Sequence, residues 1–214
     1  MNCCQCQGIE DLFNEANVAR ELAQYRKKGP SKTTRVLVQA LKKDGVQGLS
    51  LLDIGGGIGA IQHELVTSGV SSATDVDAST AYLAAAQTEA QRRGFGDTIH
   101  FIHGNFIDLA AQVASADIVT LDRVLCCYPD MEKLVQLSAA RAGKYYGLVY
   151  PRDVWWVKIG LRLMNVLFQM RGNPFRIFAH PTQTVEALIQ SNGLKKTFAR
   201  NGFIWQVSVF SRQV

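Results

Sequence analysis

The sequence lacks the long apolar run that a membrane-spanning helix requires. No stretch of about 18 uncharged apolar residues occurs, so we expect no transmembrane span. The chain does not open with a basic segment followed by an apolar one, so we expect no signal peptide and a cytoplasmic location. Internal repeats, low-complexity tracts and long linkers are also missing, which predicts one folded unit of ordinary domain size.

Cysteine is scarce and unevenly placed. The five cysteines fall in two groups, Cys3, Cys4 and Cys6 in one and Cys126 and Cys127 in the other. An odd number in two tight groups does not suit a disulfide framework, so we expect reduced thiols. The first group is either a terminal tail or an incomplete thiolate site, and we predict no metal. The second group is either packing material or a nucleophile or thiol acceptor, and packing is the more common role.

The composition is that of an ordinary globular protein. Apolar residues make up 47% of the 214 residues and charged residues 19%. The formal net charge of +5 suits an anionic substrate, a nucleic acid or a membrane surface, and it selects none of these partners.

Predicted strands and helices alternate through most of the chain. Two helices are expected first, at residues 9–28 and 31–43, with Ser31 as the N-cap of the second. Short apolar strands then alternate with helices, which indicates a parallel sheet covered by helices on both faces. Near the end, Asn201-Gly202 joins two apolar runs and predicts a hairpin.

The stretch "LLDIGGGIGA" places a glycine cluster where a strand ends. Glycines let the backbone turn tightly and approach a ligand, and the next helix offers free N–H groups. Gly55, Gly57 and Ala60 satisfy the dinucleotide pattern G-x-G-x-x-G/A. Asp53 argues for another ligand, because a carboxylate there suits an ammonium or sulfonium charge better than a pyrophosphate.

With this aspartate, the loop resembles the first motif of the class I S-adenosylmethionine-dependent methyltransferases, D-x-G-x-G-x-G. Asp53, Gly55, Gly57 and Gly59 match that motif. The resemblance implies a Rossmann-like, doubly wound α/β fold with a mostly parallel seven-stranded sheet and a C-terminal antiparallel hairpin. It also implies S-adenosylmethionine as cofactor and S-adenosylhomocysteine as product.

The same resemblance assigns further cofactor contacts. Asp77 would hold the ribose hydroxyls, with Asp75 as the second choice and a helix N-cap as the alternative role for Asp77. Asn105 replaces the usual acid near the adenine amino group, and Phe106 packs on either the adenine or the core. Asp122 and Arg123 would lie near the methionine end and the acceptor.

Within the superfamily, the layout is similar to the magnesium-protoporphyrin O-methyltransferase group. The shared features are the segment "CCYPDMEKLV", the apolar run after the fifth strand, the run Phe175 to Pro181 and the final hairpin. The Asn/Asp-Pro-Pro-Tyr/Phe motif of methyltransferases that modify base amino groups is missing. We therefore expect a small-molecule acceptor and no nucleic acid.

Four residues are candidates for catalysis. Methyl transfer is an in-line displacement, so the protein mainly aligns and desolvates the reactants, and a base is needed only when the acceptor must lose a proton. Arg123, Tyr150 and Arg152 follow strands on the ligand side, and His180 lies in a later turn whose histidine is more often structural. Arg152 is either a grip for an acceptor carboxylate or a solvated surface charge.

The segment 154–170 is more apolar than one surface helix needs. It caps the active site over an apolar acceptor, lies on a membrane surface, or forms core or a dimer contact. We expect residues 1–44 to form N-terminal helices that serve as a lid or a wall. Residues 45–214 form the cofactor-binding domain, with an apolar helical insertion at about 154–178.

The sequence thus predicts methyl transfer from S-adenosylmethionine to a small apolar or aromatic molecule, with oxygen as the first choice of acceptor atom. Two alternatives stay open. One is a nicotinamide-dependent oxidoreductase, and the other is a non-catalytic cofactor-binding protein on a membrane surface.

Overall fold

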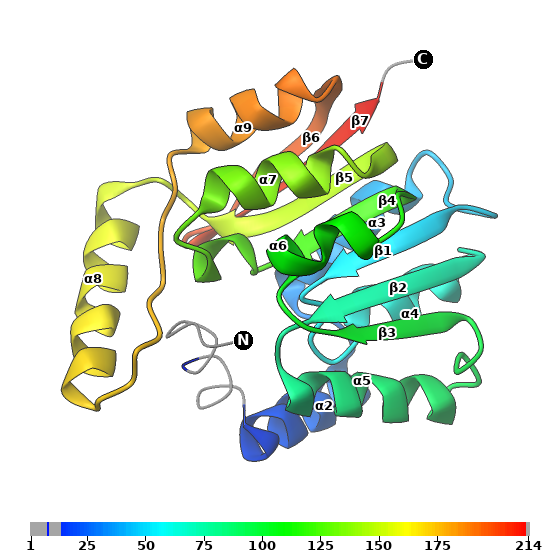
Figure 1. Cartoon of the computed structure of the whole chain (residues 1–214), viewed down its shortest axis with the longest axis horizontal. Coiled ribbons are helices and arrows are strands. Elements are labelled where there is room, and N and C mark those ends of the chain that lie inside the picture. Colours follow the sequence, from blue (N-terminus) through cyan, green and yellow to red (C-terminus); the bar gives the residue numbers. More distant parts are fainter. Residues whose placement is uncertain (1–7, 9–13, 213–214) are drawn as a thin grey trace.

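The protein is seen in a computed structural model that describes residue 8 and residues 14–212 (Figure 1). Cys3, Cys4 and Cys6, and the first part of the helix expected at 9–28, lie outside the described residues. The described elements are α2 (Glu15–Lys28), α3 (Lys32–Lys42), β1 (Ser50–Ile54), α4 (Ala60–Val66), β2 (Ser72–Asp77), α5 (Thr80–Arg92), β3 (Ile99–His103), α6 (Phe106–Leu109), η1 (Ala110–Gln112), β4 (Ala116–Asp122), η2 (Leu125–Cys127), α7 (Met131–Ala139), β5 (Ala142–Pro151), α8 (Trp155–Met170), α9 (Thr182–Ser191), β6 (Leu194–Asn201) and β7 (Trp205–Arg212).

The strands form one seven-stranded sheet in the order β3-β2-β1-β4-β5-β7-β6. Strands β1 to β5 run parallel, and β7 lies antiparallel between β5 and β6. This confirms the predicted Rossmann-like α/β fold and its C-terminal hairpin. The strand order reverses between β1 and β4, and at such a switch point ligands bind outside the carboxyl ends of the strands.

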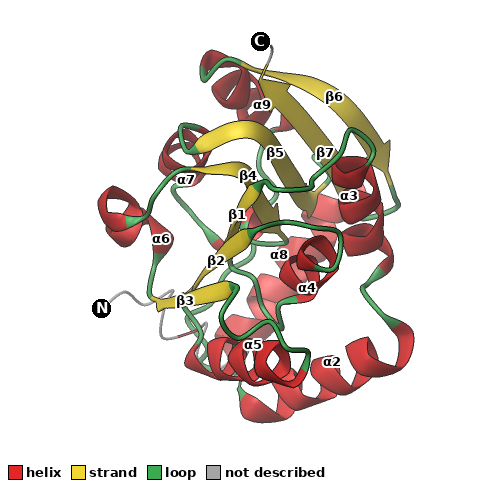
Figure 2. Cartoon of the chain, turned by 90° about the vertical axis from the view of Figure 1, so that its right-hand side faces the viewer, coloured by secondary structure: helices red, strands yellow, loops and turns green. Residues whose placement is uncertain are grey.

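Two apolar cores lie on the two faces of the sheet (Figure 2). Because side chains alternate along a strand, Leu52 and Ile54 face the helices α6, α7 and α9, whereas Leu51 faces α3 and α4. Asp53 shares the parity of Leu51 and is carried to the α4 face. The alternation that makes the cores therefore also decides on which face the carboxylates of the loop motif lie.

Helix α3 begins where the sequence predicts. The hydroxyl of Ser31 accepts a hydrogen bond from the backbone N–H of Thr34, which makes Ser31 the N-cap. Leu37 and Leu41 are buried against the sheet. This helix, from the part of the chain expected to form a lid or a wall, is thus part of the main core.

Helix α2 is held against α5 by a buried carboxylate. Glu89 on α5 accepts hydrogen bonds from Arg26 on α2, at 2.8 and 2.9 Å, and from Arg92 and Arg93 on its own helix. Hydrogen bonding by Arg92 and its neighbours holds the pKa of Glu89 well below its ordinary value. A second contact, from the hydroxyl of Tyr82 to the carboxylate of Glu21, measures 2.5 Å.

Helix α8 stands apart from the sheet, on the side toward which β1, β2 and β3 point (Figure 1). Of its 16 residues only Val157 is buried. Within the part of the chain that the structure describes, no helix is both long and apolar enough to cross a membrane.

Candidate functional site

The loop after β1 has a backbone that glycine favours. Gly55, Gly57 and Gly59 have φ values of 66°, 59° and 78°, and α4 begins at the next residue, Ala60. At Gly55 a Cβ atom would lie 2.4 Å from the Val124 side chain, so the first glycine is required by packing. At Gly57 a Cβ atom would meet only the Tyr82 ring at 3.8 Å, so this glycine leaves room beside the loop.

Asp77, the last residue of β2, is bonded to the same loop. Its Oδ2 accepts a hydrogen bond from the Gly57 N–H at 3.0 Å, and its Oδ1 accepts one from the Ser79 N–H at 2.8 Å. The N-cap of α5 is Ser79, whose hydroxyl accepts from the Tyr82 N–H. The alternative role of Asp77 as helix N-cap is therefore wrong.

Asp53 and Asp75 are register partners on β1 and β2, and both are fully buried. Asp53 accepts hydrogen bonds from Thr120 Oγ1 at 2.6 Å and from Gln62 Nε2 at 3.2 Å, while Asp75 accepts one from the Gly56 N–H. Burial raises the pKa of Asp53 to about 7 and that of Asp75 well above its ordinary value. Two buried carboxyls side by side form a site that favours a cationic ligand group.

Sequence reasoning missed Gln62 and Thr120. Thr120 pairs in register with Asp53 across β1 and β4, and Gln62 lies on the first turn of α4. The register between strands far apart in the chain supplies Thr120, and no local pattern reveals it. Gln62 follows the loop by three residues, and its spacing from the glycines was the available signal.

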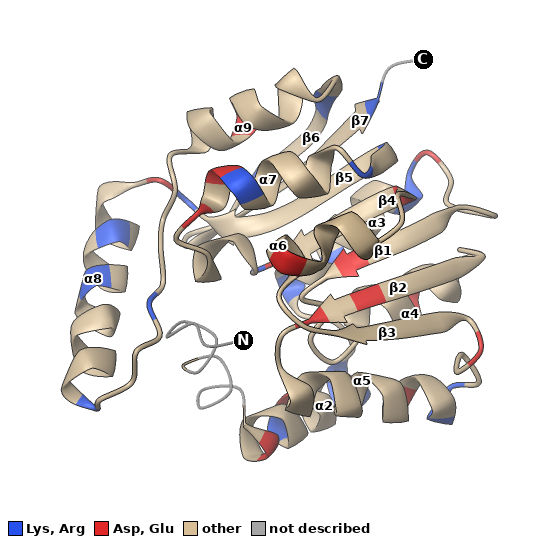
Figure 3. Ribbon diagram, in the orientation of Figure 1, with Lys and Arg blue, Asp and Glu red and all other residues tan. Residues whose placement is uncertain are grey.

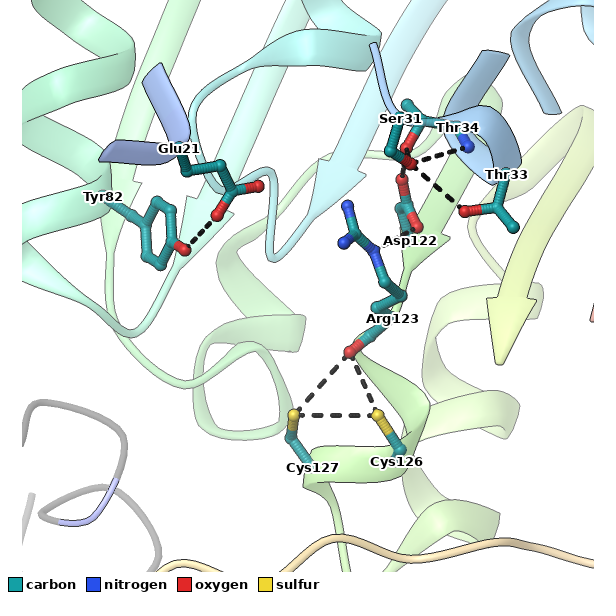
Figure 4. A network of polar contacts seen from close by, with 9 residues as sticks. All are labelled: Glu21, Ser31, Thr33, Thr34, Tyr82, Asp122, Arg123, Cys126 and Cys127. Carbon is teal, nitrogen blue, oxygen red and sulfur yellow. Dashed lines mark hydrogen bonds and ion pairs between the residues drawn. The ribbon is translucent and has the colours of Figure 1, made fainter. Parts of the chain in front are cut away.

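Asp122 and Arg123 lie at the end of β4 (Figure 4). Asp122 accepts hydrogen bonds from the hydroxyl of Thr34 and from Arg123 Nε, the latter at 3.1 Å. Arg123 has a φ of 63°, and it alone among the described residues other than glycine has a positive φ. A non-glycine residue held in this region is strained, and such strain gathers at functional sites.

The Cys126–Cys127 pair lies directly beneath this bend. Both thiols point to the carbonyl oxygen of Arg123, at 3.2 and 3.7 Å, and the two sulfur atoms are 4.0 Å apart (Figure 4). Hydrogen bonding between the two thiols and burial raise the pKa of Cys127 well above its ordinary value. A thiol kept protonated is a poor nucleophile, so the packing interpretation fits better than the nucleophilic one.

The contacts of Asn105 and Phe106 differ from those of an open adenine site. Asn105 Oδ1 accepts hydrogen bonds from the Tyr128 hydroxyl at 2.9 Å and from the Ile107 N–H at 3.2 Å. An amide oxygen has two lone pairs, so an adenine amino group would have to displace one of these donors. Phe106 is 1% exposed and belongs to the core, with the Arg141 guanidinium over its ring. Of its two proposed roles, this placement favours packing.

Two of the four catalytic candidates lie away from the loop motif. Tyr150 is buried in the core on the α7 face, opposite the face that carries Asp53. Arg152 donates a hydrogen bond to the Gly202 carbonyl at 3.0 Å, and its guanidinium lies over the Trp156 ring, where it joins the hairpin to α8. The strand-end rule placed both residues near a ligand, but it does not say on which face of the sheet a side chain lies.

His180 contacts the turn η2. Its Nε2 lies 3.1 Å from the Leu125 carbonyl oxygen, and its ring stacks on Phe178. Burial lowers the pKa of His180, so the ring is neutral near pH 7. His180 and Arg123 thus both border η2, and Tyr150 and Arg152 do not share these contacts.

Acidic side chains therefore gather at the ends of β1 and β2, beside a loop of left-handed glycines (Figure 3). Residues 52–149 match the family described as methyltransferase domain. Among curated protein sequences, none matches the chain significantly.

Solved structures of similar shape are methyltransferases. Magnesium protoporphyrin IX methyltransferase from Synechocystis PCC 6803, with bound SAH, has a TM-score of 0.75 and 19% identity, covering 98% of this chain and 100% of that chain. The same enzyme with bound SAM gives a TM-score of 0.73 at 18% identity over 98% of this chain and 97% of that one. Geranyl diphosphate C-methyltransferase from Streptomyces coelicolor gives 0.67 at 12% identity over 84% and 75%.

The chain thus has the fold of the class I S-adenosylmethionine-dependent methyltransferases, and residues 52–149 match a methyltransferase domain. In particular, it resembles magnesium-protoporphyrin methyltransferase over nearly its whole length. The domain match and these structures imply S-adenosylmethionine as the cofactor.

Proposed function

We propose that this protein transfers a methyl group from S-adenosylmethionine to a small apolar or aromatic molecule, with oxygen as the acceptor atom. One observation carries the proposal. The left-handed glycine loop lies at the switch point of the sheet and is bonded to Asp77, next to the buried carboxyls of Asp53 and Asp75.

The residues present fit this cofactor. Gly57 leaves space beside the loop, so a ligand can approach the backbone closely. A carboxylate at the end of β2 can accept two hydroxyl hydrogen bonds, which suits Asp77 to a ribose. The negative field of Asp53 and Asp75 suits a ligand that carries sulfonium and ammonium charges. The glycines Gly55 and Gly59 shape the loop itself.

The further contacts remain part of the proposal. Asn105 and Phe106 would border the adenine, with the Tyr128 hydroxyl sharing the Asn105 oxygen. Asp122 would border the methionine end, where Thr34 and Arg123 now hold it.

The cofactor, when bound, supplies a methyl group already activated by its sulfonium charge. The chain's own residues then align the acceptor and exclude water. Arg123 and His180 border η2 and are the residues we place on the acceptor side. A neutral His180 can take a proton from an acceptor hydroxyl, once the bond to the Leu125 carbonyl has fixed its other nitrogen. Tyr150 supports β5 from the core, and Arg152 holds the hairpin against α8.

Residues 1–44 and 154–178 would close the acceptor side. At Gly8 a Cβ atom would lie 2.5 Å from the backbone nitrogen of Phe175, so the two segments meet at that point. The backbone N–H of Phe178 donates to the Cys126 carbonyl at 2.8 Å, which holds the second segment against η2. We propose that the N-terminal segment acts as the lid and the inner side of 154–178 as the cap.

The test has two parts. Calorimetric titration with S-adenosylhomocysteine and, separately, with NAD identifies the cofactor. Transfer of a labelled methyl group to phenols, aromatic carboxylic acids, thiols and magnesium protoporphyrin IX then identifies the acceptor class. Binding of NAD alone would replace the proposal with an oxidoreductase. Binding of S-adenosylhomocysteine without transfer to any acceptor would favour a non-catalytic cofactor-binding protein.

A further inference from the structure

We propose that the outer face of α8 and the tip of the β6–β7 hairpin form one surface that docks on an anionic membrane. This proposal goes beyond methyl transfer and does not depend on it. The docking surface consists of Trp155, Ile159, Leu163, Val166, Leu167, Met170, Phe203 and Ile204.

These residues are the largest exposed apolar group in the described part of the chain. Together with Met164 they make up all the large apolar side chains that are exposed there. Trp155 is 70% exposed, Met170 78% and Phe203 76%. A soluble surface rarely gathers its exposed apolar residues in one place, and such a patch marks an interaction site.

The two faces of α8 have different roles. At about 100° per residue, Val157, Leu161, Asn165 and Phe168 fall on one side, and they are the less exposed residues. Asn165 fixes this inner side through two hydrogen bonds of 2.8 Å with the backbone of Ile177. The apolar residues of the docking surface lie on the opposite side, where the chain itself offers no cover.

The hairpin tip extends the apolar face of α8. The Phe203 ring stacks on Trp156 with centroids 6.1 Å apart, and Trp155 meets Trp156 edge-on at 5.7 Å. The Arg152 backbone N–H donates to the Ile204 carbonyl at 2.8 Å, which fixes the tip in place. Trp156 thus joins two elements into one rigid platform with tryptophan at its edge, a residue that suits the membrane interface.

The charges beside this surface are basic. Residues 155–171 contain Lys158, Arg162 and Arg171 and no acidic residue (Figure 3). Lys158 forms an ion pair with Asp153, so Arg162 and Arg171 carry the net charge of the helix. By the helical repeat, Lys158 and Arg162 lie along one edge of the apolar face, between it and the inner side. An apolar face edged by cations is the pattern of a helix that lies in an anionic membrane interface.

A second copy of this chain fits the surface less well. In a two-fold contact the same patch meets itself, and Arg162 lies at the middle of α8. A contact centred on the helix would therefore bring two Arg162 side chains together without an acid from α8 between them. Lipid phosphates supply the missing negative charge.

Flotation of the purified full chain with vesicles tests the proposal. We expect binding to vesicles of equal parts phosphatidylcholine and phosphatidylglycerol, and much weaker binding to phosphatidylcholine alone. Leu163→Ser and Phe203→Ser, on separate elements, should each weaken binding by about tenfold, because each loses a large buried apolar side chain. Arg162→Gln should weaken binding only to the anionic vesicles.

Matched variants and molar mass decide the outcome. Lys43→Gln removes the same charge at an exposed position before β1, and Gln87→Ser changes an exposed position on α5; both should bind as the unaltered chain does. Since the substituted residues are exposed, unfolding midpoints should stay unchanged. Binding that ignores all three docking-surface substitutions, or no flotation with either vesicle, overturns the proposal. A dimer in light scattering that Leu163→Ser dissociates also overturns it, because the surface then serves self-association.

Discussion

The backbone N–H of Gly57 donates a hydrogen bond to Oδ2 of Asp77, 3.0 Å away. This contact joins the loop after β1 to the end of β2, so two segments 20 residues apart in the chain set one backbone shape. The glycine contributes a left-handed conformation and the aspartate contributes the acceptor. Loss of either partner should therefore affect ligand binding before it affects the fold.

Gly57→Ala should weaken cofactor binding at a modest cost in stability. The φ of 59° costs an alanine roughly 1 kcal/mol, and no close contact adds to this cost. Gly48→Ala is the matched control, because Gly48 has a φ of 76° and open space but lies outside the loop. Urea unfolding should show similar losses for both variants, and calorimetry should show weaker S-adenosylhomocysteine binding for Gly57→Ala alone. Equal affinities in the two variants would mean that the ligand does not approach the loop at Gly57.

Asp77→Asn should weaken S-adenosylhomocysteine binding by roughly 10- to 100-fold, because a charged acceptor of two hydroxyl hydrogen bonds becomes a neutral one. The shape of the side chain is kept, so the unfolding midpoint should change little. Asp97→Asn makes the same change at an exposed position and should bind normally. An unchanged affinity in Asp77→Asn would assign the ribose contact to another residue, with Asp75 as the next to test.

Asp53→Asn should change how stability depends on pH. Burial raises the pKa of Asp53 from 3.8 to about 7 in the folded protein. The folded state therefore keeps a proton that the unfolded state releases, and the free energy of unfolding falls as the pH rises from about 4 to about 7. Asparagine is neutral throughout, so the variant should gain stability relative to the unaltered chain, by a few kcal/mol, between about pH 5 and pH 8.

Urea unfolding at several pH values measures this difference. Asp97→Asn serves again as the control, and its curve should run parallel to that of the unaltered chain. A difference between Asp53→Asn and the unaltered chain that stays constant with pH would show that Asp53 is ionised in the folded state across this range. The same variant should bind S-adenosylhomocysteine more weakly, since it lacks the carboxylate for the ligand's ammonium group.

Arg26→Gln should loosen α2 while leaving the rest of the fold intact. Arg26 is the arginine that joins α2 to Glu89, whereas Arg92 lies on the same helix as Glu89. We expect hydrogen exchange in residues 15–28 to speed up by roughly fivefold in Arg26→Gln and to stay unchanged in Arg92→Gln. Faster exchange in both variants, or in neither, would show that α2 is held by its apolar contacts and not by this ion pair.

Glu89→Gln should remove stability that depends on acid. The arginines lower the pKa of Glu89 below its ordinary value of 4.5 in the folded state. Its contribution is therefore fully present above that value and is lost as the pH falls below it. At neutral pH the variant should lose about 1–3 kcal/mol, since a buried charged acceptor of several hydrogen bonds becomes neutral. In acid the two proteins should converge, and thermal unfolding at both pH values measures this; a loss that persists in acid would contradict the assignment.

Local patterns were enough for the main architecture. Apolar alternation predicted the parallel sheet, Asn201-Gly202 predicted the hairpin, and Ser31 was predicted as an N-cap. Each of these signals depends on neighbouring residues, and the chain realises them with little help from distant contacts. The glycine loop is of the same kind, because the conformation and the residue type are linked at each position.

Residues shared by two roles needed the structure. Phe106 fits both an adenine contact and the core, and only its burial separates the two. Tyr150 lies near a strand end, but its parity carries it to the α7 face, away from Asp53. Arg152 is drawn to the Gly202 carbonyl by the fold-back of the hairpin, which local sequence does not encode.

The sequence by itself determined the alternation of strands and helices, the glycine loop and the carboxylate that precedes it. Tertiary structure alone decided that Asp53 lies beside Asp75 and under Thr120, and that the outer face of α8 stays uncovered. The reason is physical. Helix and turn preferences act over a few residues, whereas the register between strands and the cover of a helix depend on packing between segments far apart in the chain.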